Sequence, residues 1–188
     1  GDDPPRLRLA TTTAEEERLD AVLRPLGTGI DVLRREPPIV LAPGAGFGEA
    51  KCWPAESFAA LADRLAREDA PVFIVGAPGE EALVASVVRA MRTWPVVLAG
   101  VLDLGAFKVL LRHARLLVAN DAGARHIAAA FGVPSVIFFG PTSVAKTQPC
   151  SMASTDRRPV PDARGNPWTF DRTRPSWSAS SSRRRYSS

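Results

Sequence analysis

Two short glycine-containing segments carry the residue types best suited to chemistry in this chain. The first, residues 42–54, holds one lysine, Lys51, in a glycine-rich stretch that includes Gly44. The second, residues 120–130, begins Asn-Asp-Ala-Gly-Ala-Arg-His. A glycine-rich turn and a helix start both expose backbone N–H groups, and a lysine adds a full positive charge. Together they predict a site for an anionic ligand, and a phosphorylated compound is the natural candidate.

The elements that must position these segments alternate along the chain. Apolar runs typical of buried strands cover residues 39–42, 71–75, 96–98, 115–119 and 135–139. Helical spacing covers residues 12–26, 54–68, 79–91, 104–113 and 123–131. We expect the first of these helices to have Thr12 or Thr13 as its N-cap and to end at Gly27. Five strands separated by helices predict right-handed crossovers and an α/β fold with a parallel, doubly wound, Rossmann-like sheet. Ligands bind such sheets at the carboxyl ends of the strands, where both segments fall.

Charge divides the 188 residues into a neutral body and a basic tail. Residues 151–188 have a net charge of +5 and the remaining 150 residues a net charge of −1. The high isoelectric point therefore belongs to the tail, and nucleic acid is not an expected partner of the body. We expect residues 1–36 to form a linker and a helix, residues 37–150 a Rossmann-like domain, and residues 151–188 a disordered or out-of-frame tail.

The remaining composition excludes several classes of protein. Cys52 and Cys150 are the only cysteines, and neither a CxxC pair nor a Cys/His group is present, so a disulfide framework or zinc site is not expected. No window reaches the roughly 18 to 20 apolar residues of a transmembrane helix. We therefore expect a cytoplasmic protein with no metal and no cofactor.

Four segments in order resemble the bacterial lipopolysaccharide heptosyltransferases. They are Pro43-Gly44-Ala45 with Lys51-Cys52-Trp53-Pro54, Gly76-Ala77-Pro78-Gly79-Glu80-Glu81, Asn120-Asp121-Ala122-Gly123-Ala124-Arg125-His126-Ile127-Ala128-Ala129-Ala130, and Phe139-Gly140-Pro141-Thr142. The resemblance covers about residues 37–147, and the ordered set restricts the family far more than any single segment does. It implies that residues 37–150 are a nucleotide-sugar-binding domain, the half of a GT-B fold that binds an ADP-heptose donor, in an inverting transfer of heptose to the lipopolysaccharide core. It also implies a full-length enzyme that is peripheral at the inner membrane.

The resemblance also implies roles for individual residues. Lys51 becomes the catalytic cation, because negative charge builds on the phosphate when its bond to the sugar breaks. Loss of one well-placed donor of this kind costs about 2.7 to 4 kcal/mol in the barrier, so Lys51→Ala should slow a competent enzyme by about 10² to 10³-fold. The expected donor-binding residues are Gly44, Lys51, Glu80, Glu81, Asp121, Ala122, Gly123 and His126.

Each of these residues also has a simpler interpretation. Asp121 could serve only as a helix N-cap, His126 could be a packed histidine, and Glu80 and Glu81 suit a helix start without a ligand. Lys51 could be an ordinary solvated side chain, although the chain has 3 lysines against 21 arginines. Ligand roles are favoured for Lys51 and Asp121 and, by the resemblance, for His126.

The sequence departs from the family pattern at several points. Ala122 stands where a hydroxyl residue is usual, and Arg125 stands where the family often has an apolar residue. Residues 1–36 do not match an N-terminal acceptor domain, and the presumed catalytic base, an aspartate of that domain, has no counterpart. We therefore expect the lipopolysaccharide acceptor to bind through a missing domain, and this chain to bind the donor weakly and to transfer nothing alone.

Three other functions stay open. A GT-B relative that uses another nucleotide sugar would carry the same phosphate site. A non-catalytic Rossmann-like remnant would bind nothing through Lys51. A nicotinamide-dependent oxidoreductase is disfavoured, because Gly44, Gly46 and Gly48 lack the G-x-G-x-x-G spacing.

Overall fold

The computed structural model of this chain describes residues 9–44, 52–66 and 70–139. The chain divides into two units, Gly1–Ala153 and Ser154–Ser188, and every described residue belongs to the first. The expectations for Lys51 and for the C-terminal tail therefore lie outside the described residues.

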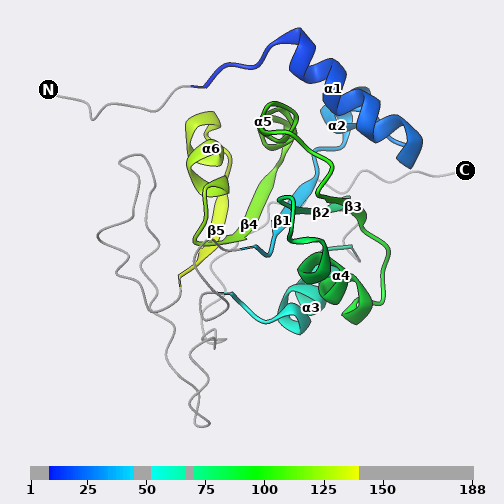
Figure 1. The fold of residues 1–188 in the computed structure, drawn as a ribbon, viewed down its shortest axis with the longest axis vertical. Coiled ribbons are helices and arrows are strands. Elements are labelled where there is room, and N and C mark those ends of the chain that lie inside the picture. Colours follow the sequence, from blue (N-terminus) through cyan, green and yellow to red (C-terminus); the bar gives the residue numbers. More distant parts are fainter. Residues whose placement is uncertain (1–8, 45–51, 67–69, 140–188) are drawn as a thin grey trace, which may run out of the picture. The chain divides into compact units, whose positions relative to one another are not determined.

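Five parallel strands form the sheet, in the order β3-β2-β1-β4-β5 (Figure 1). Their bounds are Ile39–Ala42 for β1, Val72–Gly76 for β2, Val96–Ala99 for β3, Leu116–Asn120 for β4 and Ser135–Phe138 for β5. The order reverses between β1 and β4, which pair in parallel register from Ile39 opposite Leu116 to Ala42 opposite Ala119. This confirms the predicted doubly wound sheet and places its switch point between β1 and β4, where such sheets bind ligands.

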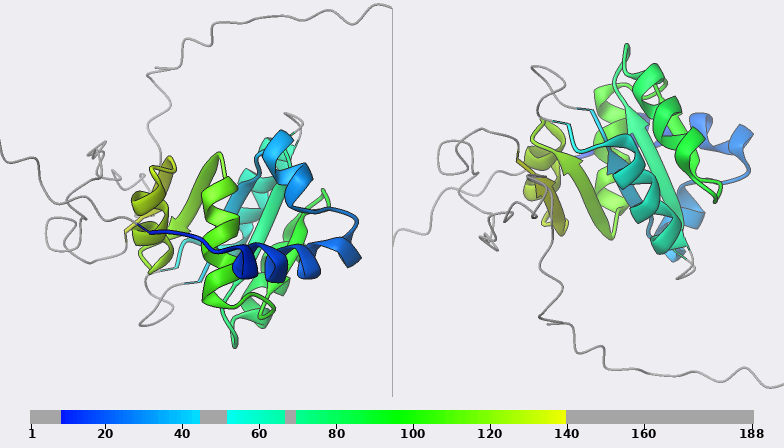
Figure 2. Two further views of the ribbon diagram at one scale, coloured as in Figure 1. Left: turned by 90° about the horizontal axis from the view of Figure 1, so that it is seen from above. Right: turned by 90° about the horizontal axis from the view of Figure 1, so that it is seen from below.

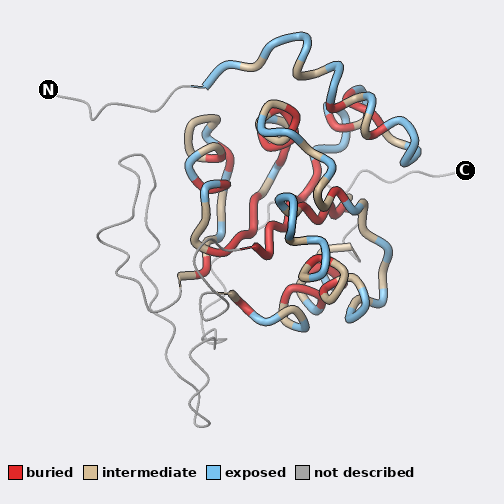
Figure 3. The backbone as a smooth tube through the Cα atoms, viewed as in Figure 1, coloured by how far each residue is buried: buried red, intermediate tan, exposed pale blue. Residues whose placement is uncertain are grey.

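Helices cover both faces of the sheet, as the two views of Figure 2 show. One face carries α3 (Ala55–Ala66) and α4 (Glu81–Ala90), and the other carries α5 (Leu104–His113) and α6 (Ala124–Phe131). The side chains of β1 alternate between these layers: Val40 and Ala42 belong to the hydrophobic cluster beneath α5, so alternation places Ile39 and Leu41 on the α3 side. All four are buried (Figure 3), as their continuous apolar run predicted.

The N-terminal residues add a third helical element to the face that carries α5. Helix α1 (Thr13–Leu23) begins with a capping box between Thr12 and Glu15, and its Leu19 and Leu23 are fully buried. The predicted helix over residues 12–26 ends earlier than expected, because Pro25 converts its last turn into the 3₁₀-helix η1 (Arg24–Leu26). Thr12 as N-cap and Gly27 as stop are confirmed, the latter with a φ of 78°.

The sequence did not predict helix α2, which spans Ile30–Arg35 and connects this region to β1. Six residues are too few to establish a helical period, and the Asp20 carboxylate, not a neighbour in sequence, accepts from the Ile30 N–H at 2.9 Å. None of the helices among the described residues is both long enough and apolar enough to cross a membrane.

Candidate functional site

A cavity of about 330 Å³ opens at the carboxyl edge of the sheet. Strands β1 and β2, the turn after β2, the connection from β3 to α5 and the start of α6 all contribute to its wall. Its lining residues are Ala42, Gly44, Val75, Gly76, Ala77, Pro78, Glu80, Leu102, Asp103, Leu104, Phe107, Ala122, Gly123 and Ala124. The cavity therefore brings four of the predicted donor-binding residues together, namely Gly44, Glu80, Ala122 and Gly123.

The amide side chain of Asn120 fixes the two ends of the first glycine-rich segment. Its Nδ2 donates to the Pro43 carbonyl at 2.6 Å, and its Oδ1 accepts from the Trp53 N–H at 3.0 Å. Asn120 ends β4 and is fully buried, so both bonds are shielded from water. Sequence reasoning gave this residue no role, although a buried amide after an apolar strand must find partners, and that was the available signal.

Aromatic packing fixes Trp53, at the end of the first glycine-rich segment, in the core. The Trp53 ring stacks on Phe138 of β5 with ring centroids 4.1 Å apart, and it meets Phe58 of α3 edge-on at 5.0 Å. Trp53 is 9% exposed, so it serves the core rather than offering a stacking surface to a ligand.

Glu80 and Gly44 lie next to each other in the wall of the cavity. The Glu80 carboxylate accepts from the Ala77 N–H at 2.8 Å, which closes the turn after β2. A Cβ on residue 44 would overlap that carboxylate, so only glycine leaves room for it. Gly44 thus has a steric reason to be glycine, and Glu80 presents an acceptor to the cavity.

The start of α6 contributes hydrogen-bond donors. Gly123 is its N-cap and provides no side-chain cap, and no described residue accepts from the backbone N–H groups of Ala122, Gly123 or Ala124. All three residues line the cavity. The helix dipole points its positive end at the same place, so this edge favours an anionic group.

Three predicted site residues lie outside the lining of the cavity. The Glu81 carboxylate accepts from the Gly79 N–H at 3.1 Å, and its own and Gly79's backbone N–H groups lower its pKa. His126 is exposed on α6, where partial desolvation and the Arg125 charge lower its pKa. Asp121 precedes α6 and contacts the side chain of Arg125 in that helix instead of the cavity. Their ligand roles stay predictions.

Asp121 and Arg125 form a buried ion pair beside the start of α6. The Arg125 Nε lies 3.2 Å from Asp121 Oδ1, and the two side chains are 6% and 8% exposed. Both Nε and Nη1 of Arg125 are buried without a hydrogen-bond acceptor among the described residues, while the guanidinium lies 5.6 Å from the Phe139 ring centroid. The contact is therefore ionic, and Asp121 is not the N-cap that the simpler interpretation assigned to it.

Asp103 is a second residue of the candidate site that sequence reasoning missed. It is the N-cap of α5, accepting from the Ala106 N–H at 2.6 Å, and it also lines the cavity. That backbone hydrogen bond is the largest of the causes that lower its pKa. An aspartate immediately before a helical pattern was the available signal.

The arrangement suits a ligand with a flat apolar part and an anionic part. Val75, Leu102 and Phe107 offer an apolar wall, Glu80 accepts hydrogen bonds from hydroxyl or amino groups, and the α6 amides donate to phosphoryl oxygens. Among the residues that the structure describes, no group of three His, Cys, Asp or Glu side chains could hold a metal ion.

Comparison with known proteins agrees across sequence and structure. The model of glycosyltransferase family 9 (heptosyltransferase) matches residues 5–158. Lipooligosaccharide heptosyltransferase 2 of Haemophilus influenzae is 32% identical over 158 residues, which are 82% of this chain and 45% of that protein. Lipopolysaccharide heptosyltransferase 2 of Escherichia coli is 35% identical over 119 residues, which are 61% of this chain and 34% of that protein.

Solved structures give the same result. The glycosyl transferase family 9 structure from Veillonella parvula superposes with a TM-score of 0.64 at 26% identity, covering 72% of this chain and 38% of that one. The E. coli ADP-heptose lps heptosyltransferase II structure superposes with a TM-score of 0.62 at 29% identity, covering 73% and 40%. This chain spans less than half the length of these relatives. On the family match, the sequence identity and the shared fold, the chain belongs to glycosyltransferase family 9, the heptosyltransferase family.

Proposed function

We propose that this chain binds an ADP-sugar, with ADP-heptose as the expected donor, in an inverting glycosyltransferase of lipopolysaccharide core synthesis. The observation that carries this proposal is the cavity, which joins an apolar wall, the Glu80 carboxylate and the α6 amides that donate to no described residue. The family and the names of the relatives support heptose as the sugar and lipopolysaccharide as the acceptor.

The donor would lie across the switch point of the sheet. The base packs against Val75, Leu102 and Phe107, the ribose hydroxyls donate to Glu80, and the diphosphate accepts from the N–H groups of residues 122–124. This pose uses each part of the cavity wall for the part of the nucleotide that matches it chemically.

Transfer would break the bond between the sugar and the terminal phosphate oxygen while the acceptor hydroxyl forms the new bond to the sugar. The electron pair of the broken bond stays on the phosphate, which leaves as ADP, and the acceptor hydroxyl loses its proton to a base. The α6 amides are fixed before the reaction and stabilise the new charge on the phosphate. Lys51 keeps its predicted role as the accompanying cation, and it lies outside the described residues.

The partner and setting follow from the same proposal. The acceptor is a lipopolysaccharide core that binds opposite the donor, on the second domain of a GT-B fold. The reaction belongs on the cytoplasmic side of the inner membrane, where nucleotide sugars are available.

Calorimetry with the 188-residue chain tests the donor site through two adjacent acids. Glu80→Ala removes the acceptor in the cavity and should weaken ADP binding by about 10- to 150-fold, since a hydrogen bond to a charged group contributes about 1.5 to 3 kcal/mol. Glu81→Ala tests the other predicted acid: Glu81 does not line the cavity, so its loss should weaken ADP binding much less than the loss of Glu80.

Two further titrations identify the parts of the ligand. Adenosine should bind more weakly than ADP, because it lacks the phosphates that meet the α6 amides. UDP or GDP binding more tightly than ADP would instead indicate the relative with another nucleotide sugar. No binding of any nucleoside diphosphate, or equal losses in Glu80→Ala and Glu81→Ala, would contradict the proposed function.

A further inference from the structure

Helix α1 is seated against the first turn of α5, immediately behind the cavity wall. Gly105, the second residue of α5, leaves no space for a side chain: a Cβ there would lie 2.8 Å from Arg18 Nη2 and 2.9 Å from Glu15 Cγ. Leu19 and Leu23 of α1 are fully buried in the same cluster as residues of α5. Helix α1 is therefore packed closely on α5. Helix α5 supplies Leu104 and Phe107 to the cavity wall, and Asp103 is its N-cap.

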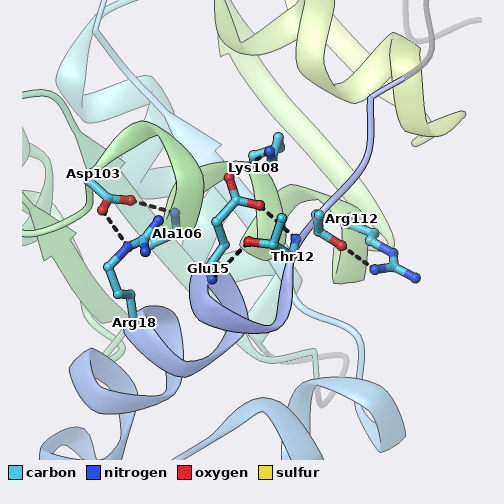
Figure 4. Close-up of polar contacts among 8 residues, drawn as sticks. Thr12, Glu15, Arg18, Asp103, Ala106, Lys108 and Arg112 are labelled. Carbon is cyan, nitrogen blue, oxygen red and sulfur yellow. Dashed lines mark hydrogen bonds and ion pairs between the residues drawn. The ribbon is translucent and has the colours of Figure 1, made fainter.

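Polar contacts along α1 and α5 are shown in Figure 4. The Lys108 ammonium donates to Glu15 Oε1 at 2.7 Å, and the side chains of this pair are 18% and 15% exposed. The hydrogen bond from Lys108 is the largest cause that lowers the pKa of Glu15. Glu15 also completes the capping box of α1 through its bond from the Thr12 N–H at 2.8 Å. One carboxylate thus couples the start of α1 to the side of α5.

Arg18 is the contact of α1 that reaches a cavity residue. Its Nε donates to Asp103 Oδ2 at 2.7 Å, while Asp103 Oδ1 accepts from the Ala106 N–H as the N-cap of α5. Both oxygens of Asp103 are therefore engaged by the protein (Figure 4). Its pKa is lowered by the Ala106 hydrogen bond and further by the Arg18 charge, so the carboxylate is ionised at neutral pH.

An ionised carboxylate in this wall poses an electrostatic problem for an anionic ligand. Asp103 and Glu80 are the two acidic residues of the lining, and no lysine or arginine lines the cavity among the described residues. A nucleoside diphosphate entering between them meets like charge, which opposes binding. Arg18 supplies a compensating charge from outside the cavity, and its bond holds Oδ2 of Asp103.

We propose that Arg18 of helix α1 is a positioning residue for the nucleotide pocket, which compensates the charge of Asp103 and holds its carboxylate in place. The inference rests on the proposed function, since it assumes an anionic ligand in the cavity. It gives α1 a role in ligand binding, although none of its residues lines the cavity.

The test measures ADP affinity by calorimetry for the full chain and its variants. Arg18→Ala should raise the Kd about two- to fivefold, the range of an exposed ion pair, because both side chains are about half exposed. Arg34→Ala is the matched control: Arg34 also pairs with a carboxylate of α1, that of Glu16 at 2.9 Å, and does not line the cavity. It should leave the Kd unchanged.

A double-mutant cycle separates the charge of Asp103 from the packing of α1. Asparagine is also a good N-cap, so Asp103→Asn keeps the start of α5 and removes the charge. In that background Arg18→Ala should no longer change the Kd, and Arg18→Lys in the original background should recover part of the affinity.

The outcomes distinguish this inference from the proposed function. An unsubstituted chain that binds no nucleoside diphosphate would overturn both. An Arg18→Ala variant with unchanged Kd, or an equal loss in Arg34→Ala, or an effect that persists in the Asp103→Asn background, would overturn the role of Arg18 alone.

Discussion

Replacing Asn120 by alanine is the sharpest test of how the site is held. The side chain bridges the Pro43 carbonyl and the Trp53 N–H, and all three residues are buried. Removing the bridge takes one hydrogen bond from each of two buried backbone groups, at about 1 to 3 kcal/mol each. We therefore expect Asn120→Ala to lower the free energy of unfolding by about 2 to 6 kcal/mol, out of the roughly 5 to 15 kcal/mol typical of a domain.

Urea unfolding followed by circular dichroism measures that loss, and calorimetry with ADP measures its effect on the site. Because Asn120 fixes both ends of the segment that contains Lys51, the ADP affinity should fall together with the stability. Asp63→Ala is the matched control. Asp63 is also buried and accepts from the backbone N–H groups of Arg92 and Thr93, but it does not line the cavity.

The control should lose stability and keep its ADP affinity when measured well below its unfolding transition. An Asn120→Ala chain within about 0.5 kcal/mol of the unsubstituted chain, the range of ordinary surface substitutions, would refute the structural reasoning. A stability loss without a larger affinity loss than in Asp63→Ala would refute the link between the bridge and the ligand site.

Three further predictions follow from the described contacts. Arg125→Met should cost about 3 to 5 kcal/mol in urea unfolding, because it leaves the buried Asp121 charge unpaired, and Asp121→Asn combined with Arg125→Met should recover much of it. Burial and neighbouring arginines hold the pKa of His113 below its ordinary 6.5. The stability that the neutral His113 contributes is therefore fully present above pH 6.5 and is lost as the pH falls below it. In a plot of the free energy of unfolding against pH, His113→Gln should flatten this decline. Gly44→Ala should displace the Glu80 carboxylate and weaken ADP binding in calorimetry with little change in stability, because the displaced group ends a flexible side chain.

Local signals in the sequence predicted most of the secondary structure. The helix over residues 104–113 was predicted with its observed bounds, because its apolar positions recur at helical spacing. Strands β1 and β2 were found because each is a short apolar run that is buried on both faces of a parallel sheet. Helix α2 was missed, since its six residues are fixed partly by a contact from Asp20.

The candidate site was predicted only in part, because some of its contacts join distant parts of the chain. The turn at Gly44, the acid at Glu80 and the helix start at Ala122 and Gly123 are local features, and the structure brings them together in one cavity. Local signals marked Asn120 as a buried amide and Asp103 as a helix cap, but the partners Trp53 and Arg18 lie far away in the chain, and no local pattern identifies them.

The sequence by itself determined the alternation of strands and helices, the position of both glycine-containing segments at strand ends, and the family resemblance. It could do so because hydrophobic period, caps and turns are properties of neighbouring residues. Only the tertiary structure decided that Asn120 joins Pro43 to Trp53, that Asp121 pairs with Arg125 of the following helix, and that α1 approaches Asp103 through Arg18. The physical reason is that each polar side chain could bond several partners, and tertiary packing determines which of them lies within hydrogen-bond distance.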